Sequence, residues 1–220
     1  MSLWAVIVRP SPVMKIKSAT FEVSAPNLRS CPRLALPEFA FIGRSNVGKS
    51  SLLNMLTERS GLAKVSDLPG KTQLMNFFTI NLNWRLVDLP GYGYAHVAKT
   101  DRADFNEAVA DYIEGRENLR GVFALIDSRL PPQAIDVDFI NWLTGTGVPF
   151  VLIFTKTDKL SVSQAQTNIG RFKQTVFAGL DPQPTVFASS SKTKVGRTQI
   201  LQYIAKKLAE KNPSGGTASE

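Results

Sequence analysis

Short apolar runs alternate with amphipathic segments along most of the chain, beginning at residue 38. Apolar runs bounded by turn residues predict buried strands, and apolar residues at helical spacing predict helices that cover a sheet. Strands are expected near residues 38–42, 75–81, 84–88, 121–127, 148–154 and 184–188, and helices near 48–59, 102–115, 133–145, 161–178 and 195–210. The alternation predicts an α/β domain with a mostly parallel, six-stranded sheet and helices on both faces.

Two of the expected strands, 75–81 and 84–88, are separated only by a short turn around Asn83. Such spacing predicts an antiparallel hairpin, which would put one antiparallel strand at the edge of the sheet. Ser161 and Gln164 have the spacing of a capping box, which marks the start of a helix. We expect one domain over residues 37–210, preceded by a basic extension that packs on it or flanks it (1–36) and followed by a disordered tail (211–220).

The positive charge is concentrated at the two ends of the chain, whose net charge is +8. Residues 1–36 hold five basic residues against one acidic residue, and the chain from Lys192 onward holds six against two. Such ends favour binding to a polyanion such as RNA, although an ordinary solubilising surface explains them as well. Cys31 is the single cysteine, so no disulfide can form within the chain. Without an apolar run of transmembrane length or a signal peptide, we expect a cytoplasmic protein.

Residues 43–50 match the phosphate-binding pattern G-x-x-x-x-G-K-[ST] and lie between an expected strand and an expected helix. In such a loop, backbone N–H groups and the helix N-terminus surround phosphates. Lys49 would reach the β- and γ-phosphates, and the Ser50 hydroxyl would hold Mg²⁺. A plain glycine-rich turn that caps a helix is the alternative. The candidate phosphate-contacting residues are Gly43, Arg44, Ser45, Asn46, Val47, Gly48, Lys49, Ser50 and Ser51.

Three later segments each follow an expected strand. Asp88, Leu89, Pro90 and Gly91 form the first. Asp88 could reach Mg²⁺ through water, and the Gly91 N–H could face the γ-phosphate. Because the carboxyl ends of parallel strands meet at one edge of a sheet, all these segments should lie close together.

The other two segments point to guanine. In Thr155, Lys156, Thr157 and Asp158, the carboxylate could accept the adjacent N–H groups that guanine, unlike adenine, presents at N1 and N2. Lys156 would lie along the nucleotide. Ser189, Ser190 and Ser191 could bring backbone N–H groups to the guanine O6, although serine runs also form plain loops.

The motifs in this order resemble those of the EngB family, also called YihA or YsxC, in the TrmE-Era-EngA-EngB-septin superfamily of GTPases. The resemblance is most specific in residues 43–54, 69–73 and 88–94. It implies a three-layer P-loop fold, the Ras-like G domain, and a role in large ribosomal subunit assembly and normal cell division. It also adds Pro69, Gly70, Lys71 and Thr72 to the nucleotide site. Thr72 would hold Mg²⁺ through its hydroxyl and touch the γ-phosphate through its N–H, so Lys49, Thr72 and Gly91 form the implied catalytic set.

Tyr92 departs from Ras, in which a glutamine follows the Asp-x-x-Gly motif and orients the attacking water. We therefore expect slow intrinsic hydrolysis. Asn46 resembles the asparagine of GTPases that bind K⁺ beside the phosphates, which could compensate for the missing glutamine. His96, the only histidine, is expected to be an exposed loop residue, with a partner contact or a proton carrier as the alternatives.

The leading hypothesis is a monomeric GTP-dependent switch with Mg²⁺, and with K⁺ as a further cofactor. Its partners would be GTP, GDP, the large-subunit precursor and ribosomal RNA, with no membrane. One alternative is a GTP-dependent interaction module of division or membrane proteins with little turnover. Another is a P-loop ATPase or phosphotransferase, which would leave Asp158 without a role.

Overall fold

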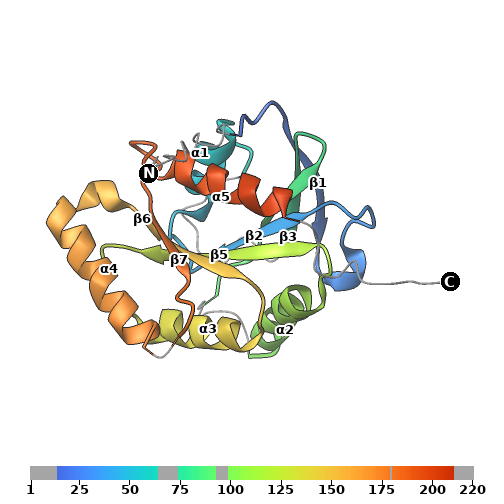
Figure 1. Ribbon diagram of the computed structural model, residues 1–220. Helices are drawn as coiled ribbons and strands as arrows, with labels where there is room; N and C mark the ends of the chain where they lie inside the picture. The colour runs from blue at the N-terminus through green and yellow to red at the C-terminus, as the bar shows by residue number, and fades with distance from the viewer. Residues whose placement is uncertain (1–13, 64–73, 93–98, 179, 211–220) are drawn as a thin grey trace, which may run out of the picture.

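The computed structural model describes residues 14–63, 74–92, 99–178 and 180–210, and for residues 99–106 it describes the backbone alone. One seven-stranded sheet runs through the molecule in the order β1-β3-β4-β2-β5-β6-β7 (Figure 1). The strands are β1 (Ala19–Ala25), β2 (Glu38–Gly43), β3 (Met75–Ile80), β4 (Trp84–Asp88), β5 (Leu119–Asp127), β6 (Phe150–Thr155) and β7 (Thr185–Ala188). The helices are α1 (Lys49–Thr57), α2 (Lys99–Gly115), α3 (Ala134–Gly145), α4 (Val162–Val176) and α5 (Arg197–Ala209).

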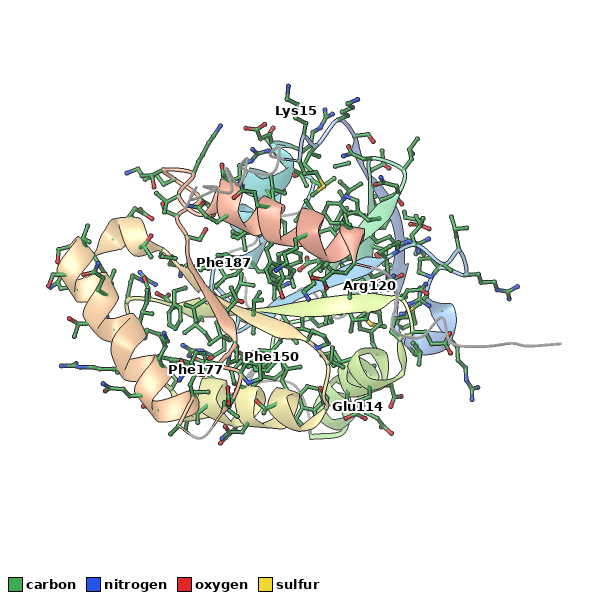
Figure 2. The ribbon with its side chains drawn as sticks, in the orientation of Figure 1. Lys15, Glu114, Arg120, Phe150, Phe177 and Phe187 are labelled. Atoms are coloured by element: carbon green, nitrogen blue, oxygen red, sulfur yellow. The ribbon has the colours of Figure 1, made fainter. Side chains whose placement is uncertain are left out.

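Helices cover both faces of the sheet, with α1 and α5 on one side and α2, α3 and α4 on the other (Figure 1). Successive side chains of β2 point to opposite faces of the sheet, so this strand contributes to both cores. Phe39 and Phe41 pack towards α1 and α5, and Ala40 and Ile42 pack towards the other side. Figure 2 shows Phe187 on the α5 side and Phe150 with Phe177 on the opposite side. The α/β class with helices on both faces is therefore confirmed.

The sheet has seven strands rather than the six expected. The additional strand, β1, pairs antiparallel with β3 and forms the edge, and β3 pairs antiparallel with β4 in the expected hairpin. The sequence pattern missed β1 because most of its residues are at least partly exposed and the pairing is interrupted by a bulge between Phe21 and Val23. The domain boundaries expected at residues 37 and 210 stay predictions.

The capping box at the start of α4 is confirmed. The Gln164 N–H donates to the Ser161 hydroxyl at 3.2 Å, and the Ser161 N–H donates to the Gln164 side chain at 3.2 Å. Within the described ranges, the structure contains no helix that is long and apolar enough to cross a membrane.

A buried ionic network closes the amino end of the sheet, where β2 and β4 begin. The Glu38 carboxylate accepts four hydrogen bonds: one each from Arg85 and Tyr112, and two from Arg116. Arg85 also binds Glu22 of β1 and the Leu34 carbonyl. Glu38 and Arg85 are both fully buried, and this network ties β1 and the segment after it to the central strands.

Candidate nucleotide-binding site

The candidate residues gather at the carboxyl edge of the parallel strands, opposite the buried ionic network. The phosphate loop follows β2, Asp88 ends β4, Asp127 ends β5, the Thr155–Asp158 segment follows β6 and the serines follow β7. These strands are adjacent in the sheet, so their loops converge on one edge. Open α/β sheets bind ligands at such an edge.

The phosphate loop turns from β2 into α1. Gly48, the N-cap of α1, has φ 99° and so requires the left-handed conformation that glycine adopts without strain. Asn46 has φ 62°, a conformation that asparagine tolerates better than most residues. Because α1 begins directly after this turn, its positive dipole end and its first N–H groups, which have no partner within a helix, lie at the loop, as anion binding requires.

Lys49 and Asp88 form an ion pair at the centre of the edge, with side chains 10% and 6% exposed. Ser50, next along the chain, is half-buried in the first turn of α1. Gly91 lies against the phosphate loop, because a Cβ on it would stand 2.8 Å from the Gly43 carbonyl oxygen. A side chain at position 91 would therefore push this segment away from the loop.

Hydroxyl and carboxylate oxygens from Ser50 and Asp88 suit Mg²⁺, which prefers hard oxygen donors. Across the described residues, no group of three or more acidic, cysteine or histidine side chains could hold a metal by itself. That donor set fits Mg²⁺, which is usually bound by one or two protein groups together with substrate phosphates and water.

The segment after β6 is joined directly to the phosphate loop. The Thr155 hydroxyl donates to the Val47 carbonyl at 2.6 Å, and Lys156 donates to the Asn46 carbonyl. Lys156 also pairs with Asp127 at 2.9 Å. The loop that could contact phosphates and the loop that could contact a base are therefore held as one unit.

Asp158 is linked to the segment after β7. The Ser190 hydroxyl donates to the Asp158 carboxylate at 2.7 Å, and the Thr157 N–H and hydroxyl both donate to the Ser189 carbonyl, at 3.2 and 3.1 Å. The Ser190 hydrogen bond lowers the pKa of Asp158, so this carboxylate is ionised at neutral pH. An ionised acceptor is the form that two adjacent N–H donors of guanine require.

Sequence reasoning missed two acidic residues at this edge. Asp127 accepts two hydrogen bonds from the Arg129 side chain and one from Lys156. Burial alone would raise the pKa of Asp127, but these hydrogen bonds outweigh it and lower the pKa to about 2. A carboxylate directly after an apolar run was the signal that singled out Asp88, and the same signal would have found Asp127.

The second missed residue is Asp136, in the first turn of α3 and 1% exposed. It accepts hydrogen bonds from Arg44 of the phosphate loop at 3.1 Å and from the Tyr92 hydroxyl at 3.0 Å. The Tyr92 ring also stacks on Phe139 with centroids 4.3 Å apart. The expected residues Pro69, Gly70, Lys71, Thr72 and His96 lie outside the described ranges.

This arrangement defines a P-loop domain of the guanine-nucleotide-binding class. The comparisons with known sequences agree. A sequence model of the family described as 50S ribosome-binding GTPase matches residues 38–156. The probable GTP-binding protein EngB of Porphyromonas gingivalis is 50% identical over 191 residues, which cover 87% of this chain and 95% of that protein. The protein of the same name from Flavobacterium johnsoniae is 47% identical over 205 residues, 92% of this chain and 98% of its own.

Solved structures give the same fold. A crystal structure of a probable GTP-binding protein EngB matches 79% of this chain and 100% of its own, with a TM-score of 0.64 and 22% identity. A crystal structure of Era with MgGDPNP and nucleotides 1506–1542 of 16S ribosomal RNA matches 81% of this chain and 58% of its own, with a TM-score of 0.63 and 19% identity. The chain belongs to the EngB family of GTP-binding proteins, within the 50S ribosome-binding GTPases. It is a GTPase, and the ATPase alternative is set aside.

Proposed function

We propose that this GTPase is a molecular switch in the assembly of the large ribosomal subunit. The match of residues 38–156 to ribosome-binding GTPases is the observation that supports the proposal most strongly. The two basic ends of the chain suit contacts with the phosphates of ribosomal RNA, which need no sequence-specific motif. The proposed form is a cytoplasmic monomer that joins precursor particles with GTP bound and leaves after hydrolysis, and a need in cell division and septation would follow from its role in assembly.

The proposed phosphate site uses the loop at residues 43–51. Lys49 would leave Asp88 and bind the β- and γ-phosphates, which frees the Asp88 carboxylate for a water on Mg²⁺. Ser50 and, by family resemblance, Thr72 would bind the metal directly. Bound Mg²⁺ would neutralise charge on the phosphates, and Gly91, which lies against the phosphate loop, would offer its N–H to the γ-phosphate.

The proposed base site uses the segments after β6 and β7. Asp158 would accept the two N–H donors of guanine, while the backbone of Ser189–Ser191 approaches O6 and Lys156 lies along the nucleotide. The bond between Thr155 and the Val47 carbonyl supports this assignment, because it fixes the base site relative to the phosphates. An ATP-specific enzyme would have no use for such an ionised acceptor.

We propose that intrinsic hydrolysis is slow because the side chain after Gly91 is turned towards α3. The Tyr92 hydroxyl binds Asp136 and its ring lies on Phe139, so it is not available to orient a water as glutamine does in Ras. A K⁺ ion near the exposed Asn46 would supply positive charge instead. Hydrolysis in K⁺ should then exceed that in Na⁺, and Asn46→Ala should abolish the difference. Equal rates in both salts would remove the K⁺ site.

The test of the ribosomal role is nucleotide-dependent co-sedimentation with isolated large subunits and precursor particles. The GTP-analogue form should sediment with them and the GDP form should not. Depletion in cells should lower mature large subunits and accumulate precursors, with failed septation later. Binding that ignores the nucleotide, together with unaltered ribosome profiles, would overturn the proposal.

The second candidate is an interaction module of division or membrane proteins with little turnover, which the position of Tyr92 also permits. The two functions separate in a turnover assay with large subunits added. The switch predicts that the subunits accelerate hydrolysis, whereas the module predicts no acceleration and GTP-dependent capture of a division protein instead.

A further inference from the structure

One buried carboxylate connects the phosphate loop with the segment that follows Gly91. Asp136 Oδ1 accepts both the Arg44 Nε–H at 3.1 Å and the Tyr92 hydroxyl at 3.0 Å. Arg44 and Tyr92 are each adjacent in sequence to a glycine, Gly43 and Gly91. These two glycines lie close together, since a Cβ on Gly91 would stand 2.8 Å from the Gly43 carbonyl oxygen. The contacts form a closed ring from the phosphate loop through α3 and back.

A helix-stabilising role does not account for this position. An acidic residue in the first turn of a helix interacts favourably with the helix dipole, but an exposed carboxylate achieves that as well. Asp136 is instead 1% exposed, where burial raises its pKa and the Arg44 charge opposes the rise. Buried ion pairs contribute little net stability, so a role in geometry is the better explanation of this one.

Tyr92 is held at both ends of its side chain. Its hydroxyl binds Asp136, and its ring stacks on Phe139, nearly one turn further along α3. Burial raises the pKa of Tyr92, so the hydroxyl stays protonated and donates to the carboxylate. Because Tyr92 directly follows Gly91, this double anchor fixes where the Gly91 N–H stands on the phosphate loop.

An apolar cavity lies beside the Tyr92 anchor. Tyr92, Phe139 and Trp142 line an apolar cavity of about 390 Å³ between α2 and α3. Trp142, which lines the same cavity, has its indole 5.6 Å from the ring of Phe139, so its fluorescence can report a change at Tyr92.

We propose that Asp136 is a positioning residue for GTP hydrolysis, which transmits the state of the phosphate loop through Arg44 to Tyr92 and holds the Gly91 N–H where the γ-phosphate needs it. Asp136 touches no reacting atom, and the inference concerns the GTPase reaction itself, so it holds whether or not a ribosomal particle is the partner. The nucleotide grip of Lys49 and Asp158 is independent of this ring. Losing the ring should therefore affect the transition state more than ground-state binding.

The chain offers a matched control for the test. Tyr112 is a second buried tyrosine whose hydroxyl donates to a buried carboxylate, that of Glu38, at 2.9 Å and at the other end of the sheet. Tyr92→Phe and Tyr112→Phe remove the same atom from the same kind of partner. Both retain the ring, and both should lower thermal stability to a similar, small extent.

Single-turnover and steady-state GTP hydrolysis should separate the two tyrosines. Tyr92→Phe should lower kcat about 5- to 20-fold with KM within about twofold, whereas Tyr112→Phe should leave both unchanged. Asp136→Asn, which keeps an acceptor for Tyr92 but removes the charge that binds Arg44, should also lower kcat. Arg44→Ala should then add little to Asp136→Asn, since both break one contact.

Trp142 fluorescence gives a readout that a purely structural role would not change. The unmodified protein should show a difference between the GDP and GTP-analogue forms that Trp142→Phe abolishes and Tyr92→Phe reduces. If Tyr92→Phe and Asp136→Asn lower kcat no more than Tyr112→Phe does and keep the full fluorescence difference, Asp136 only supports the fold and the proposal fails. An equal rise in KM with unchanged kcat would overturn it too.

Discussion

At each end of the sheet, a buried carboxylate accepts hydrogen bonds from an arginine and a tyrosine. The two carboxylates differ in how many hydrogen bonds they accept and in how far their arginine is buried. At the amino end, Glu38 takes four hydrogen bonds, and its partner Arg85 is fully buried. At the carboxyl end, Asp136 takes its two on a single oxygen, and the Arg44 side chain is 25% exposed. A tyrosine hydroxyl donates to the carboxylate in both places.

The difference separates architecture from function. A carboxylate whose acceptor positions are filled by protein donors can only hold its neighbours in place, because any rearrangement leaves a buried charge unpaired. Lys49, Asp88 and Asp158 at the other end are partnered in ways that a nucleotide can replace. The amino end is expected to determine stability, and the carboxyl end binding and turnover.

The largest predicted effect is a loss of stability when the buried ionic network around Glu38 is broken. Glu38→Ala removes the carboxylate that pairs with the partly buried Arg116 and one of the two that pair with the fully buried Arg85, which keeps Glu22. It should lower the free energy of unfolding by about 3 kcal/mol, measured by urea denaturation. GTP affinity of the folded fraction should stay unchanged. Glu114→Ala, an exposed position on α2 (Figure 2), is the control and should change stability by less than about 0.5 kcal/mol.

Removing the lysine of the phosphate loop should weaken GTP binding and leave stability nearly unchanged. Lys49→Ala removes the charge expected to bind two phosphates and should weaken GTP about 100-fold or more by calorimetry, which is about 2.7 kcal/mol. Lys15→Ala, at an exposed lysine (Figure 2) whose carbonyl accepts a hydrogen bond from Asn81 in the β3–β4 turn, should bind GTP normally. Near-normal GTP binding by Lys49→Ala would mean that the carboxyl end of the sheet does not hold the nucleotide.

A change at Asp158 should alter which nucleotide the protein prefers, and not only how tightly it binds GTP. Asp158→Asn replaces an acceptor pair with an amide that can donate, so GTP should weaken about 10- to 100-fold while xanthosine triphosphate, which carries a carbonyl at C2, gains. Competition against a fluorescent nucleotide measures both. Ser190→Ala, which removes only the hydroxyl that donates to Asp158, should weaken GTP less and leave the preference for guanine intact.

Within the described residues, sequence periodicity predicted the five α-helices and six of the seven strands, because buried apolar runs and amphipathic spacing are local properties. The motifs also fell at strand ends, so the edge where they meet followed from the parallel sheet. β1 escaped because a half-exposed edge strand lacks a continuous apolar run. Neither Glu38 nor Arg85 looked different from a strand residue until the register placed them opposite each other.

Asp136 shows why part of the site could not be predicted. Its two partners lie 92 and 44 residues away along the chain, and no local pattern distinguishes it from an ordinary acidic residue in the first turn of a helix. Burial of such a side chain arises only from tertiary packing. Tyr92 could be marked from sequence as a departure from glutamine, but its direction, towards α3, required the structure.

The smallest predicted effect concerns Asp127, which lies at the open edge but is partly closed by Arg129 and Lys156. Because its pKa in the folded protein, about 2, is below the ordinary value of about 4, this carboxylate contributes stability above pH 4 that is lost as pH falls towards 2. The Arg129 side chain is 44% exposed, so solvent screens its share to about 1 kcal/mol or less. Arg129→Ala should therefore be slightly less stable than the parent at pH 7, and the difference should disappear between pH 4 and pH 2 in nucleotide-free urea titrations.

Arg120→Ala is the control, since no ion pair of that side chain occurs within the described residues. If the stability difference for Arg129→Ala persists unchanged at pH 2, Arg129 stabilises the fold through packing and not through its ion pair with Asp127.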